Sequence, residues 1–444
     1  MFENNKILIL GFAKSGYEAA KFLLKRGNEV YLTDMKTDHD KDQMKELESL
    51  GIKFVLGEHP DDLLDSSFDY LIKNPGVPID HKYVLKAHEL GIEVINEVEM
   101  AYRLLPKGVK FIGITGTNGK TTTTTLVYKF LIEDGKSAHL TGNIGYPLTG
   151  FLDKLKKGDI IVMETSCQQL ENLTKFNPDV AVMTNLSPAH IDFLKSYDNY
   201  KRVKTKIFQN HTSKNVAILN LENEDVMDAT KDIKSTVKYF SSKKEINGCY
   251  IKNNAIYYYD EKVVDLKDIK LIGVHNYENI MAAIMVVKEF GVKNESIINV
   301  LKTFNGVEHR IEFVREYKGI KFYNDSKATN TKATQIALSS FKTPVIIILG
   351  GLERNHDFFE LKDYMKHVKY IVAMGQCRNR VEEFAKALGI PCSNVEFLKE
   401  AVPIAVKEAQ KGDTVLLSPA SASWDQYEHF ENRGDEFKEL VNKL

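Results

Sequence analysis

The sequence predicts a three-domain α/β protein whose sheets are mostly parallel. Two observations point to this fold class: short apolar runs recur along the whole chain, and helix-length amphipathic segments lie between most of them. Strands buried on both faces show such continuous apolar runs, because helices cover both sides of a parallel sheet. The expected strands are residues 7–10, 30–33, 111–115, 160–163, 180–183, 216–219, 345–349, 371–374 and 415–417. The expected helices include residues 17–26, 121–134, 279–290 and 378–388.

This alternation of strands and helices starts three times, which divides the chain into three domains. It begins near residue 6, starts again near residue 109 and starts a third time after residue 306. Residues 250–265, with a turn at the Asn-Asn pair 253–254, are expected to form a surface β-hairpin inserted in the middle domain. The expected domains are residues 1–98, 99–305 and 306–444.

The composition excludes several classes of protein. Because 60 Lys and Arg residues balance 61 Asp and Glu residues, no global charge attracts the chain to nucleic acid or to an anionic membrane. No stretch approaches the ~18–20 apolar residues of a membrane span. The four cysteines, at positions 167, 249, 377 and 392, form no Cys-x-x-Cys pair, which argues against a zinc site or a disulfide framework. We expect a cytoplasmic protein with neither nucleic acid nor membrane as a partner.

The strongest functional signal is residues 112–122, where an apolar run leads into Gly116-Thr-Asn-Gly-Lys120 and a threonine-rich helix start. Such a phosphate-binding loop holds a triphosphate with backbone N–H groups. Lys120 can neutralise the β and γ oxygens, and the Thr121 hydroxyl can ligate Mg²⁺. The strict pattern has a glycine where Ile114 stands. A glycine-rich turn with an incidental lysine is the alternative.

Polar residues after two further apolar runs are candidates for a metal site. Glu164 ends the run at 160–163, at the sheet edge where ligands bind; its carboxylate suits Mg²⁺, although a helix cap or a solvated loop residue is the alternative. His190 follows the next run, but it is an unusual candidate because Mg²⁺ prefers oxygen ligands. The basic segment 200–208, which includes Lys204, is interpreted from its residues alone as a solvated helix face.

The N-terminal domain begins with a glycine turn. Residues 11–16, Gly-Phe-Ala-Lys-Ser-Gly, follow the first strand and open a helix, and Asp34 ends the next strand. The arrangement resembles a dinucleotide fingerprint and predicts a Rossmann-like domain. Ala13 replaces the middle glycine, which argues against an NAD-type approach of a pyrophosphate. Binding of another diphosphate, or of nothing, remains open.

Three polar loops of the last third each follow an apolar run, at residues 323–330, 350–354 and 418–425. Because the runs are expected to be strands of one sheet, the loops should lie along the same edge of it. Their hydroxyl and cationic side chains could present a pocket to a small anion.

Together these motifs resemble the Mur ligase family, the ATP-dependent amino-acid ligases of peptidoglycan precursor synthesis. The resemblance covers essentially the whole chain, and the family's form of the phosphate loop explains the departure at Ile114. It implies a Rossmann-like N-terminal domain, a central P-loop ATPase domain and a C-terminal Rossmann-like α/β domain. The residues that show it are Gly-Thr-Asn-Gly-Lys-Thr at 116–121, His-Asn-Tyr-Glu-Asn-Ile-Met-Ala-Ala at 275–283, His-Arg at 309–310 and Asp-Ser-Lys-Ala-Thr at 325–329.

Within the family, residues 417–426 and 430–437 are most similar to members that add D-glutamate to UDP-N-acetylmuramoyl-L-alanine. The phosphate loop begins only at residue 116, whereas folylpolyglutamate synthetases begin close to theirs. The resemblance therefore implies an ATP-dependent acid–amino-acid ligase with UDP-N-acetylmuramoyl-L-alanine, D-glutamate and ATP as its small-molecule substrates. Another Mur-type or folylpolyglutamate-type ligase is the alternative.

The resemblance also implies roles for individual residues. Those that would bind ATP are Gly116, Thr117, Asn118, Gly119, Lys120, Thr121, Thr122, Asn276, Arg310, Asp325 and Lys327. Those that would bind the UDP-substrate are Ser15, Asp34, Asn74, Gly76 and Asn143, and those that would bind D-glutamate are Thr329, Arg354, Ser423 and Phe430. The catalytic residues would be Lys120, His190 and Lys204. Because the ATP residues belong to two domains, catalysis would require domain closure. We expect the chain to be a monomer.

The same resemblance implies two Mg²⁺ ions. Thr121 and Glu164 would hold the first ion, and His190 would hold the second together with Lys204, whose amine would carry CO2 as a carbamate. Like charge from neighbouring basic residues is expected to lower the pKa of Lys204. These neighbours are Lys201, Arg202 and Lys206.

The implied reaction makes an acyl phosphate from the L-alanine carboxylate and the γ-phosphoryl group of ATP, and the D-glutamate amine then attacks it. Cys167 is expected to take no part, as a buried and inert thiol. One rival is a P-loop kinase or hydrolase, which needs no amino-acid acceptor. The other is a nucleotide-regulated binding protein, which forms no ADP.

Overall fold

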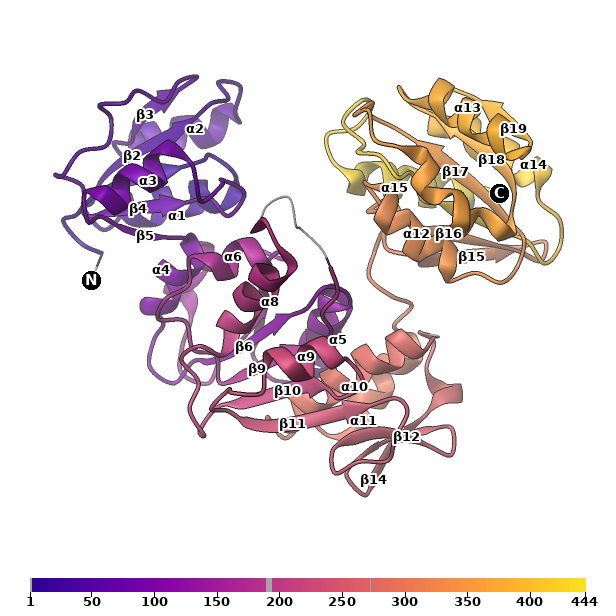
Figure 1. The fold of residues 1–444 in the computed structure, drawn as a ribbon, viewed down its shortest axis with the longest axis horizontal. Coiled ribbons are helices and arrows are strands. Elements are labelled where there is room, and N and C mark those ends of the chain that lie inside the picture. Colours follow the sequence, from indigo (N-terminus) through magenta and orange to yellow (C-terminus); the bar gives the residue numbers. More distant parts are fainter. Residues whose placement is uncertain (1, 189–193, 272) are drawn as a thin grey trace. The chain divides into compact units, whose positions relative to one another are not determined.

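The computed structural model describes residues 2–188, 194–271 and 273–444, which form two compact units (Figure 1). Unit 1 is Met1–Thr303 and unit 2 is Phe304–Leu444. In the described part of the chain, unit 1 contains a five-stranded and a nine-stranded sheet, and unit 2 contains a six-stranded sheet. Among the same residues, no helix is both long and apolar enough to cross a membrane.

The first sheet of unit 1 is parallel, with the strand order β3-β2-β1-β4-β5. The strand order reverses between β1 and β4. The loops after these strands, which include Gly11 and Asn74, therefore meet at the switch point where open α/β sheets bind ligands. The strands are β1 (Lys6–Leu10), β2 (Glu29–Asp34), β3 (Lys53–Leu56), β4 (Tyr70–Lys73) and β5 (Glu93–Ile95). The helices are α1 (Lys14–Leu24), α2 (Lys41–Ser49), α3 (Lys82–Glu89) and α4 (Glu97–Arg103).

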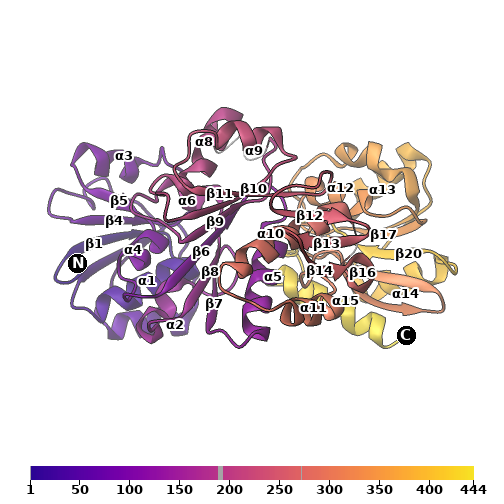
Figure 2. The same ribbon diagram turned by 90° about the horizontal axis from the view of Figure 1, so that it is seen from below.

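The second sheet has the order β14-β13-β12-β11-β10-β9-β6-β8-β7, and Figure 2 shows β11 to β7 side by side. Strand β6 lies between β8 and β9. The loop after β6 therefore leaves the sheet between the carboxyl ends of these two strands. The strands are β6 (Lys110–Thr115), β7 (Ala138–Gly142), β8 (Ile160–Glu164), β9 (Val180–Met183), β10 (Val216–Asn220), β11 (Thr236–Ser241), β12 (Cys249–Lys252), β13 (Ala255–Tyr258) and β14 (Glu261–Asp265).

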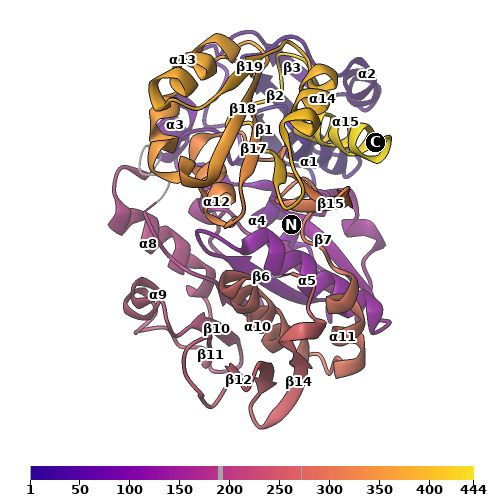
Figure 3. The same cartoon turned by 90° about the vertical axis from the view of Figure 1, so that its right-hand side faces the viewer.

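The helices that pack on this sheet connect its strands and so set where the loops between strands and helices lie. Helix α5 follows the phosphate loop and packs against α10 (Figure 3). The helices are α5 (Lys120–Glu133), α6 (Cys167–Glu171), α8 (Tyr197–Thr205), α9 (Glu224–Ala229), α10 (Val274–Lys288) and α11 (Asn294–Thr303).

The expected hairpin forms, but it extends the sheet instead of being a separate surface insertion. Strand β12 pairs in parallel with β11, and β13 and β14 continue the sheet in antiparallel pairs. Asn253 and Asn254 both have positive φ, at 48° and 55°. Such a pair suits a two-residue type I′ turn, which Asn tolerates better than most residues.

Unit 2 is built on a sheet with the order β15-β16-β20-β17-β18-β19, in which only β15 is antiparallel to its neighbour. Strand β17 shows why the sequence reads as a continuous apolar run: Ile347 belongs to the core on one face and Ile348 to the core on the other. The strands are β15 (Glu312–Tyr317), β16 (Ile320–Asn324), β17 (Val345–Gly350), β18 (Val368–Met374), β19 (Cys392–Asn394) and β20 (Thr414–Leu417). The α-helices are α12 (Thr331–Ser339), α13 (Arg378–Leu388), α14 (Leu398–Glu408) and α15 (Phe430–Asn442).

The predicted α/β class with mostly parallel sheets is confirmed, and all nine apolar runs lie in strands. Several more polar strands were not predicted, among them β7 and β16. Their residues alternate between buried and exposed positions or face solvent in part, so they lack the apolar run of a strand buried on both faces. The domain limits at residues 98 and 305 stay a prediction.

Candidate active site

The phosphate loop joins β6 to α5, and its two glycines are required by close contacts. Gly116 has φ of +145°, and a Cβ there would lie 2.0 Å from the Thr184 hydroxyl oxygen. Gly119 has φ of +80°, and a Cβ there would lie 2.1 Å from Oδ1 of Asn279. Ile114, by contrast, lies inside β6 and pairs with Glu164. The glycine of the strict pattern is absent because this position belongs to the strand and not to the turn.

The chain that follows β9 holds the loop in shape. The Thr117 N–H donates to the Asn185 carbonyl at 2.8 Å, and the Asn118 N–H donates to Asn185 Oδ1 at 2.9 Å. The Thr184 hydroxyl donates to the Asn118 carbonyl at 2.6 Å. The loop is therefore rigid before any ligand binds, which lowers the entropic cost of binding a phosphate group.

Helix α5 offers an anion-binding end directly after the loop. Its N-cap, Gly119, provides no side-chain acceptor for the first N–H groups, and such groups together with the helix dipole favour an anion. Lys120, the first residue of α5, donates from Nζ to the Thr117 carbonyl at 2.8 Å. Thr121 and Thr122 follow in the first turn, where Thr121 is buried.

Glu164 lies at the carboxyl end of β8 and has one carboxylate oxygen to spare. Its Oε1 accepts from Asn143 Nδ2 at 3.0 Å, and its backbone carbonyl accepts from the Asn143 N–H at 2.9 Å. Its Oε2 is buried and has no hydrogen-bond partner among the described residues. A buried carboxylate oxygen without a donor suits a hard divalent cation such as Mg²⁺. The residues present at this point therefore fit a metal ion.

Lys204 is buried, so the interpretation of segment 200–208 as a solvated helix face is wrong for this residue. The side chain is 1% exposed, and Nζ donates to the Thr115 hydroxyl at 2.9 Å, at the end of β6. Burial and, to a smaller extent, the charge of Lys120 together lower the pKa of Lys204 to about 7. The predicted direction is confirmed, but the predicted cause, like charge from the basic neighbours in sequence, is replaced by burial and by Lys120.

A pocket of about 560 Å³ extends from Lys120, Asn143 and Lys204 to the switch point of the first sheet. Of the residues expected to bind the UDP-substrate, four line this pocket. The lining residues that bear on the argument are Lys14, Ser15, Asn74, Gly76, Glu97, Lys120, Asn143, Cys167 and Lys204. The Asn74 side chain links the two loops of the switch point, since Nδ2 donates to Ser15 Oγ at 3.3 Å and Oδ1 accepts from the Gly76 N–H at 3.1 Å.

Asp34 differs from the other expected UDP-substrate residues, because it does not line this pocket. Its two carboxylate oxygens accept from the Phe12 N–H at 2.7 Å and from the Lys36 N–H at 2.9 Å. Asp34 thus fixes the shape of the glycine turn through backbone bonds.

Two charged residues of the pocket, Lys14 and Glu97, were not singled out from the sequence. Lys14 lies in the glycine turn, with Nζ 4.7 Å from the ring centre of Tyr146. Glu97 is buried and accepts from both the N–H and the hydroxyl of Thr149, while burial raises its pKa. The sequence could have indicated Lys14 as a candidate binding residue, because it is a basic residue inside a glycine turn. No sequence pattern indicates Glu97, since the residue that it contacts, Thr149, lies in a distant loop.

Cys167 lines the pocket as a buried thiol. Its side chain is 1% exposed and contacts Oε1 of Gln168 at 3.1 Å. Burial raises its thiol pKa, although Lys204 and Lys120 oppose this shift. The thiol is therefore protonated at neutral pH, as expected for an inert cysteine. His190 lies outside the described residues.

In unit 2, three of the expected ATP residues come together where β16 and β20 end. The Asp325 carboxylate accepts from the Ser418 hydroxyl at 2.7 Å and from the Ile311 N–H at 3.2 Å. Burial raises the pKa of Asp325 to about 7, although the positive charge of Arg310 opposes the shift. The Lys327 N–H donates to the carbonyl of His309, which precedes Arg310. Asn276, the remaining expected ATP residue, lies in the first turn of α10 in unit 1.

The residues expected to bind D-glutamate lie on the polar loops of unit 2 and at the start of α15. Thr329 is half-buried, and Phe430 is the first residue of α15. The Ser423 hydroxyl is buried without a hydrogen-bond partner among the described residues. Arg354 is exposed, with its guanidinium 4.8 Å from the ring centre of Trp424.

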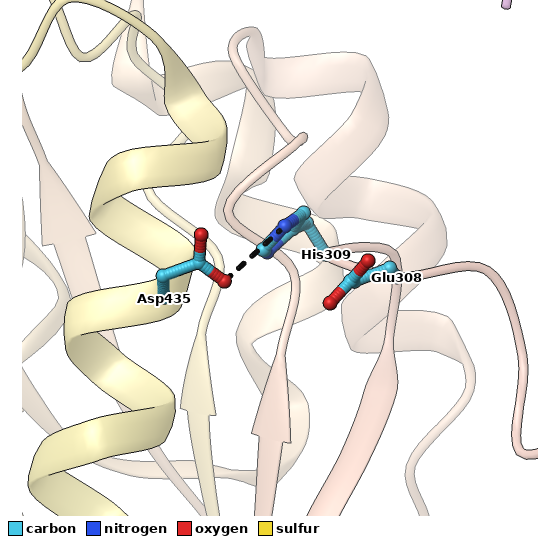
Figure 4. A group of neighbouring side chains, drawn as sticks. All are labelled: Glu308, His309 and Asp435. Carbon is cyan, nitrogen blue, oxygen red and sulfur yellow. Dashed lines mark ion pairs between the residues drawn. The ribbon is translucent and has the colours of Figure 1, made fainter. Parts of the chain in front are cut away.

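A group of metal-ligand type residues, Glu308, His309 and Asp435, also lies in unit 2 (Figure 4). Lys438 forms ion pairs with both carboxylates, at 3.0 Å for Asp435. The His309 ring accepts from Asn324 Nδ2 at 3.0 Å through Nδ1, so its remaining nitrogen, Nε2, which faces Asp435 at 3.8 Å, carries the proton. The ammonium group of Lys438 and the protonated Nε2 of His309 occupy the places where a metal ion would bind. This group of residues therefore does not suit a metal ion.

Comparison with known proteins agrees with this geometry. Three family models match the chain: "Mur ligase MurD-like, N-terminal domain" at residues 5–96, "Mur ligase middle domain" at 114–287 and "Mur ligase, glutamate ligase domain" at 309–421. The UDP-N-acetylmuramoylalanine–D-glutamate ligase of Enterococcus hirae is 46% identical over 448 residues, covering 100% of this chain and 97% of that protein. The protein of the same name from Geobacillus kaustophilus is 43% identical over 446 residues, covering 100% and 98%.

Solved structures show the same fold. The UDP-N-acetylmuramate–alanine ligase of Thermotoga maritima superimposes with a TM-score of 0.60 at 19% identity, covering 99% of each chain. At that identity the likeness concerns the fold alone. The full-length relatives at more than 40% identity, together with the three matching models, show that this chain belongs to the Mur ligase family.

Proposed function

We propose that the chain is an ATP-dependent ligase that joins D-glutamate to UDP-N-acetylmuramoyl-L-alanine. The names of the full-length relatives support this assignment. In the structure, one observation carries it. A single pocket is lined by Lys120, the lysine that follows the phosphate loop, by the Asn143 that binds Glu164, and by the glycine turn of the five-stranded parallel sheet. Such a pocket can bring a nucleotide phosphate next to a second ligand held at the switch point.

The reaction proceeds in two displacements. A carboxylate oxygen of the L-alanine attacks the γ-phosphorus of ATP, which forms the acyl phosphate and releases ADP. The amine of D-glutamate, after it loses a proton, attacks the acyl carbon, which forms the amide and releases inorganic phosphate. Lys120 and the N–H groups at the start of α5 stabilise negative charge on the transferred group, because they place positive and partly positive donors directly after the phosphate loop.

The oxygen ligands at the end of β8 and the start of α5 fit Mg²⁺. Glu164, through its unpartnered Oε2, and Thr121 would hold one ion. A bound Mg²⁺ supplies positive charge that offsets the charge on the phosphate oxygens. Asn143 holds the Glu164 carboxylate in place by its bond to Oε1.

Lys204 is proposed to carry CO2 as a carbamate and, with His190, to serve a second ion. The supporting observation is its place: the amine lies fully buried at the end of β6, beside the phosphate loop, bonded to Thr115. An amine whose pKa is lowered to about 7 has a substantial neutral fraction near neutral pH, and the neutral form is the one that adds to CO2. The addition forms the N–C bond and releases one proton, and the product carries two hard oxygen atoms.

Unit 2 is proposed to complete the site with its ATP residues Arg310, Asp325 and Lys327 and with the loops that take D-glutamate. Because Asn276 belongs to unit 1, ATP would contact both units, and domain closure would be part of the cycle. We further propose a monomeric enzyme of the cytoplasm that acts on small-molecule substrates.

The decisive experiment measures phosphate release from ATP with UDP-N-acetylmuramoyl-L-alanine and a panel of L- and D-amino acids. We expect release only when both the UDP-substrate and D-glutamate are present. Release without an amino acid would favour the kinase or hydrolase. Nucleotide binding without release for any amino acid would favour a binding protein. A preference for another amino acid would indicate a different ligase of the family.

A further inference from the structure

Arg433 is a fully buried cation for which the site described above has no role. It lies in the second turn of α15 and is 0% exposed. Among the described residues, no carboxylate forms an ion pair with it, and its Nη1 has no hydrogen-bond partner. A buried charge without a counter-ion is costly, so its presence requires an explanation.

The guanidinium ties two of the polar loops to α15. Its Nε donates to the Ser326 hydroxyl oxygen at 3.0 Å, and Nη2 donates to the Ser326 carbonyl at 2.9 Å and to the Ser421 carbonyl at 3.1 Å. The Ser326 hydroxyl donates in turn to the carbonyl of Phe430, the first residue of the same helix, at 2.8 Å. Arg433 thus adds a second link between the loops after β16 and β20, which the bond of Ser418 to Asp325 also joins.

The third polar loop, after β17, packs against the same group. A Cβ on Gly351 would lie 3.0 Å from Nη1 of Arg433, so the absence of a side chain permits this approach. The Leu352 N–H donates to the Ala422 carbonyl at 2.9 Å, which joins this loop to the loop after β20. All four residues expected to bind D-glutamate therefore lie on segments that meet around Arg433.

The charge remains on the guanidinium at neutral pH. Burial lowers the pKa of Arg433 only to about 10, with Asp425 as the main opposing influence. The Asp425 carboxylate itself accepts from the Gln376 N–H at 3.1 Å. The loops around Arg433 consequently lie in the field of a fixed positive charge, and an anion bound on them would offset its burial cost.

We propose that Arg433 is the positioning residue of the amino-acid pocket, and that its charge favours an acceptor amino acid with a second carboxylate. This inference rests on the proposed function. Arg433 would act in two ways: its hydrogen bonds hold the loops after β16 and β20, against which the loop after β17 packs, and its positive charge acts on the acceptor through space. Arg433 is not a catalytic residue, because it is buried beneath the loops.

Two substitutions separate these effects. Arg433→Lys keeps the charge but loses the fork that reaches three acceptors, and Arg433→Gln loses the charge as well. The matched control is Arg315→Lys. Arg315 donates from Nη1 to the carbonyls of Val441 and Asn442, so it also binds α15, but at the opposite end of the helix.

The loop effect is measured without any substrate. Trp424 is the sole tryptophan of the sequence, and it lies in the loop after β20 with 62% of its surface exposed. Acrylamide quenching of its fluorescence should increase in both Arg433 variants and stay at the wild-type value in the Arg315 variant. Unchanged quenching in folded Arg433→Lys and Arg433→Gln proteins would overturn the loop role.

The charge effect is measured by the preference for D-glutamate over D-glutamine, as the ratio of their kcat/KM values. We expect Arg433→Lys to raise the KM of D-glutamate while keeping most of this preference. We expect Arg433→Gln to lower the preference by about tenfold, which corresponds to ~1.4 kcal/mol. In both variants, the KM values of ATP and of the UDP-substrate should stay near wild type.

Two results would overturn the charge role: an equal loss of preference in both Arg433 variants, or a retained preference in Arg433→Gln. An increase in all three KM values would mean a general structural role, which also overturns it. If wild-type protein releases no phosphate with D-glutamate, the proposed function fails, and the quenching of Trp424 still tests the loop role by itself.

Discussion

Replacement of Lys204 by methionine should change how the stability of the protein depends on pH. Methionine has a similar length and is apolar, so it can occupy the buried site at the end of β6 without a charge. In the folded chain the pKa of Lys204 is lowered to about 7, mainly by burial, from its ordinary value of 10.5. Between these two values the unfolded chain holds a proton on this amine that the folded chain has lost.

The sign and size follow from this difference. Stability rises with pH wherever the unfolded state binds more protons, by up to ~1.4 kcal/mol per pH unit for one proton. From pH 7 to pH 9 the amine should therefore add about 2 kcal/mol to the free energy of unfolding of the wild-type chain. The methionine variant lacks this contribution. The free energy of unfolding of the wild type should thus rise by about 2 kcal/mol relative to that of the methionine variant over that interval.

The assay is urea unfolding followed by circular dichroism at pH 7, 8 and 9, in buffers free of CO2 so that the amine stays unmodified. Arg202→Met serves as the control, because Arg202 lies on the same helix and its side chain is 64% exposed. A stability difference between wild type and Lys204→Met that stays constant from pH 7 to pH 9 would refute the argument. It would mean that the buried amine keeps its ordinary pKa.

Three further outcomes are expected. Lys204→Ala should lose most of its activity and recover part of it with added short-chain carboxylates, which replace the two oxygen atoms of a carbamate; full activity in this variant would exclude the carbamate. Cys167→Ser should keep turnover within about an order of magnitude, because the acyl phosphate route needs no thioester and a buried thiol is inert; complete loss in a folded variant would contradict this. Arg354→Ala should raise the KM of D-glutamate by about ten- to a hundredfold, as expected for the loss of a charge-assisted hydrogen bond of ~1.5–3 kcal/mol. The KM values of ATP and of the UDP-substrate should hardly change, and an equal rise in all three would point to misfolding or failed closure.

Some features of the molecule follow from local sequence alone. The apolar run 345–349 becomes β17 because both of its faces are covered, and the amphipathic segment 378–388 becomes α13 with the same limits. The phosphate loop also depends on local chemistry, since Gly116 and Gly119 adopt positive φ where other residues would be strained. In each case a few neighbouring residues contain the physical cause, so the pattern can be seen without the fold.

Other features depend on groups that are distant in the chain. Lys204 has the sequence of a solvated basic helix, yet Thr115, 89 residues earlier, accepts its hydrogen bond and the surrounding core removes it from water. Arg433 is likewise an ordinary helix residue until it meets Ser326, 107 residues before it. Burial and charge depend on which segments the fold brings together. The sequence by itself therefore determined the family's motifs and the strands that form continuous apolar runs, whereas tertiary structure alone decided which charged side chains lose their water.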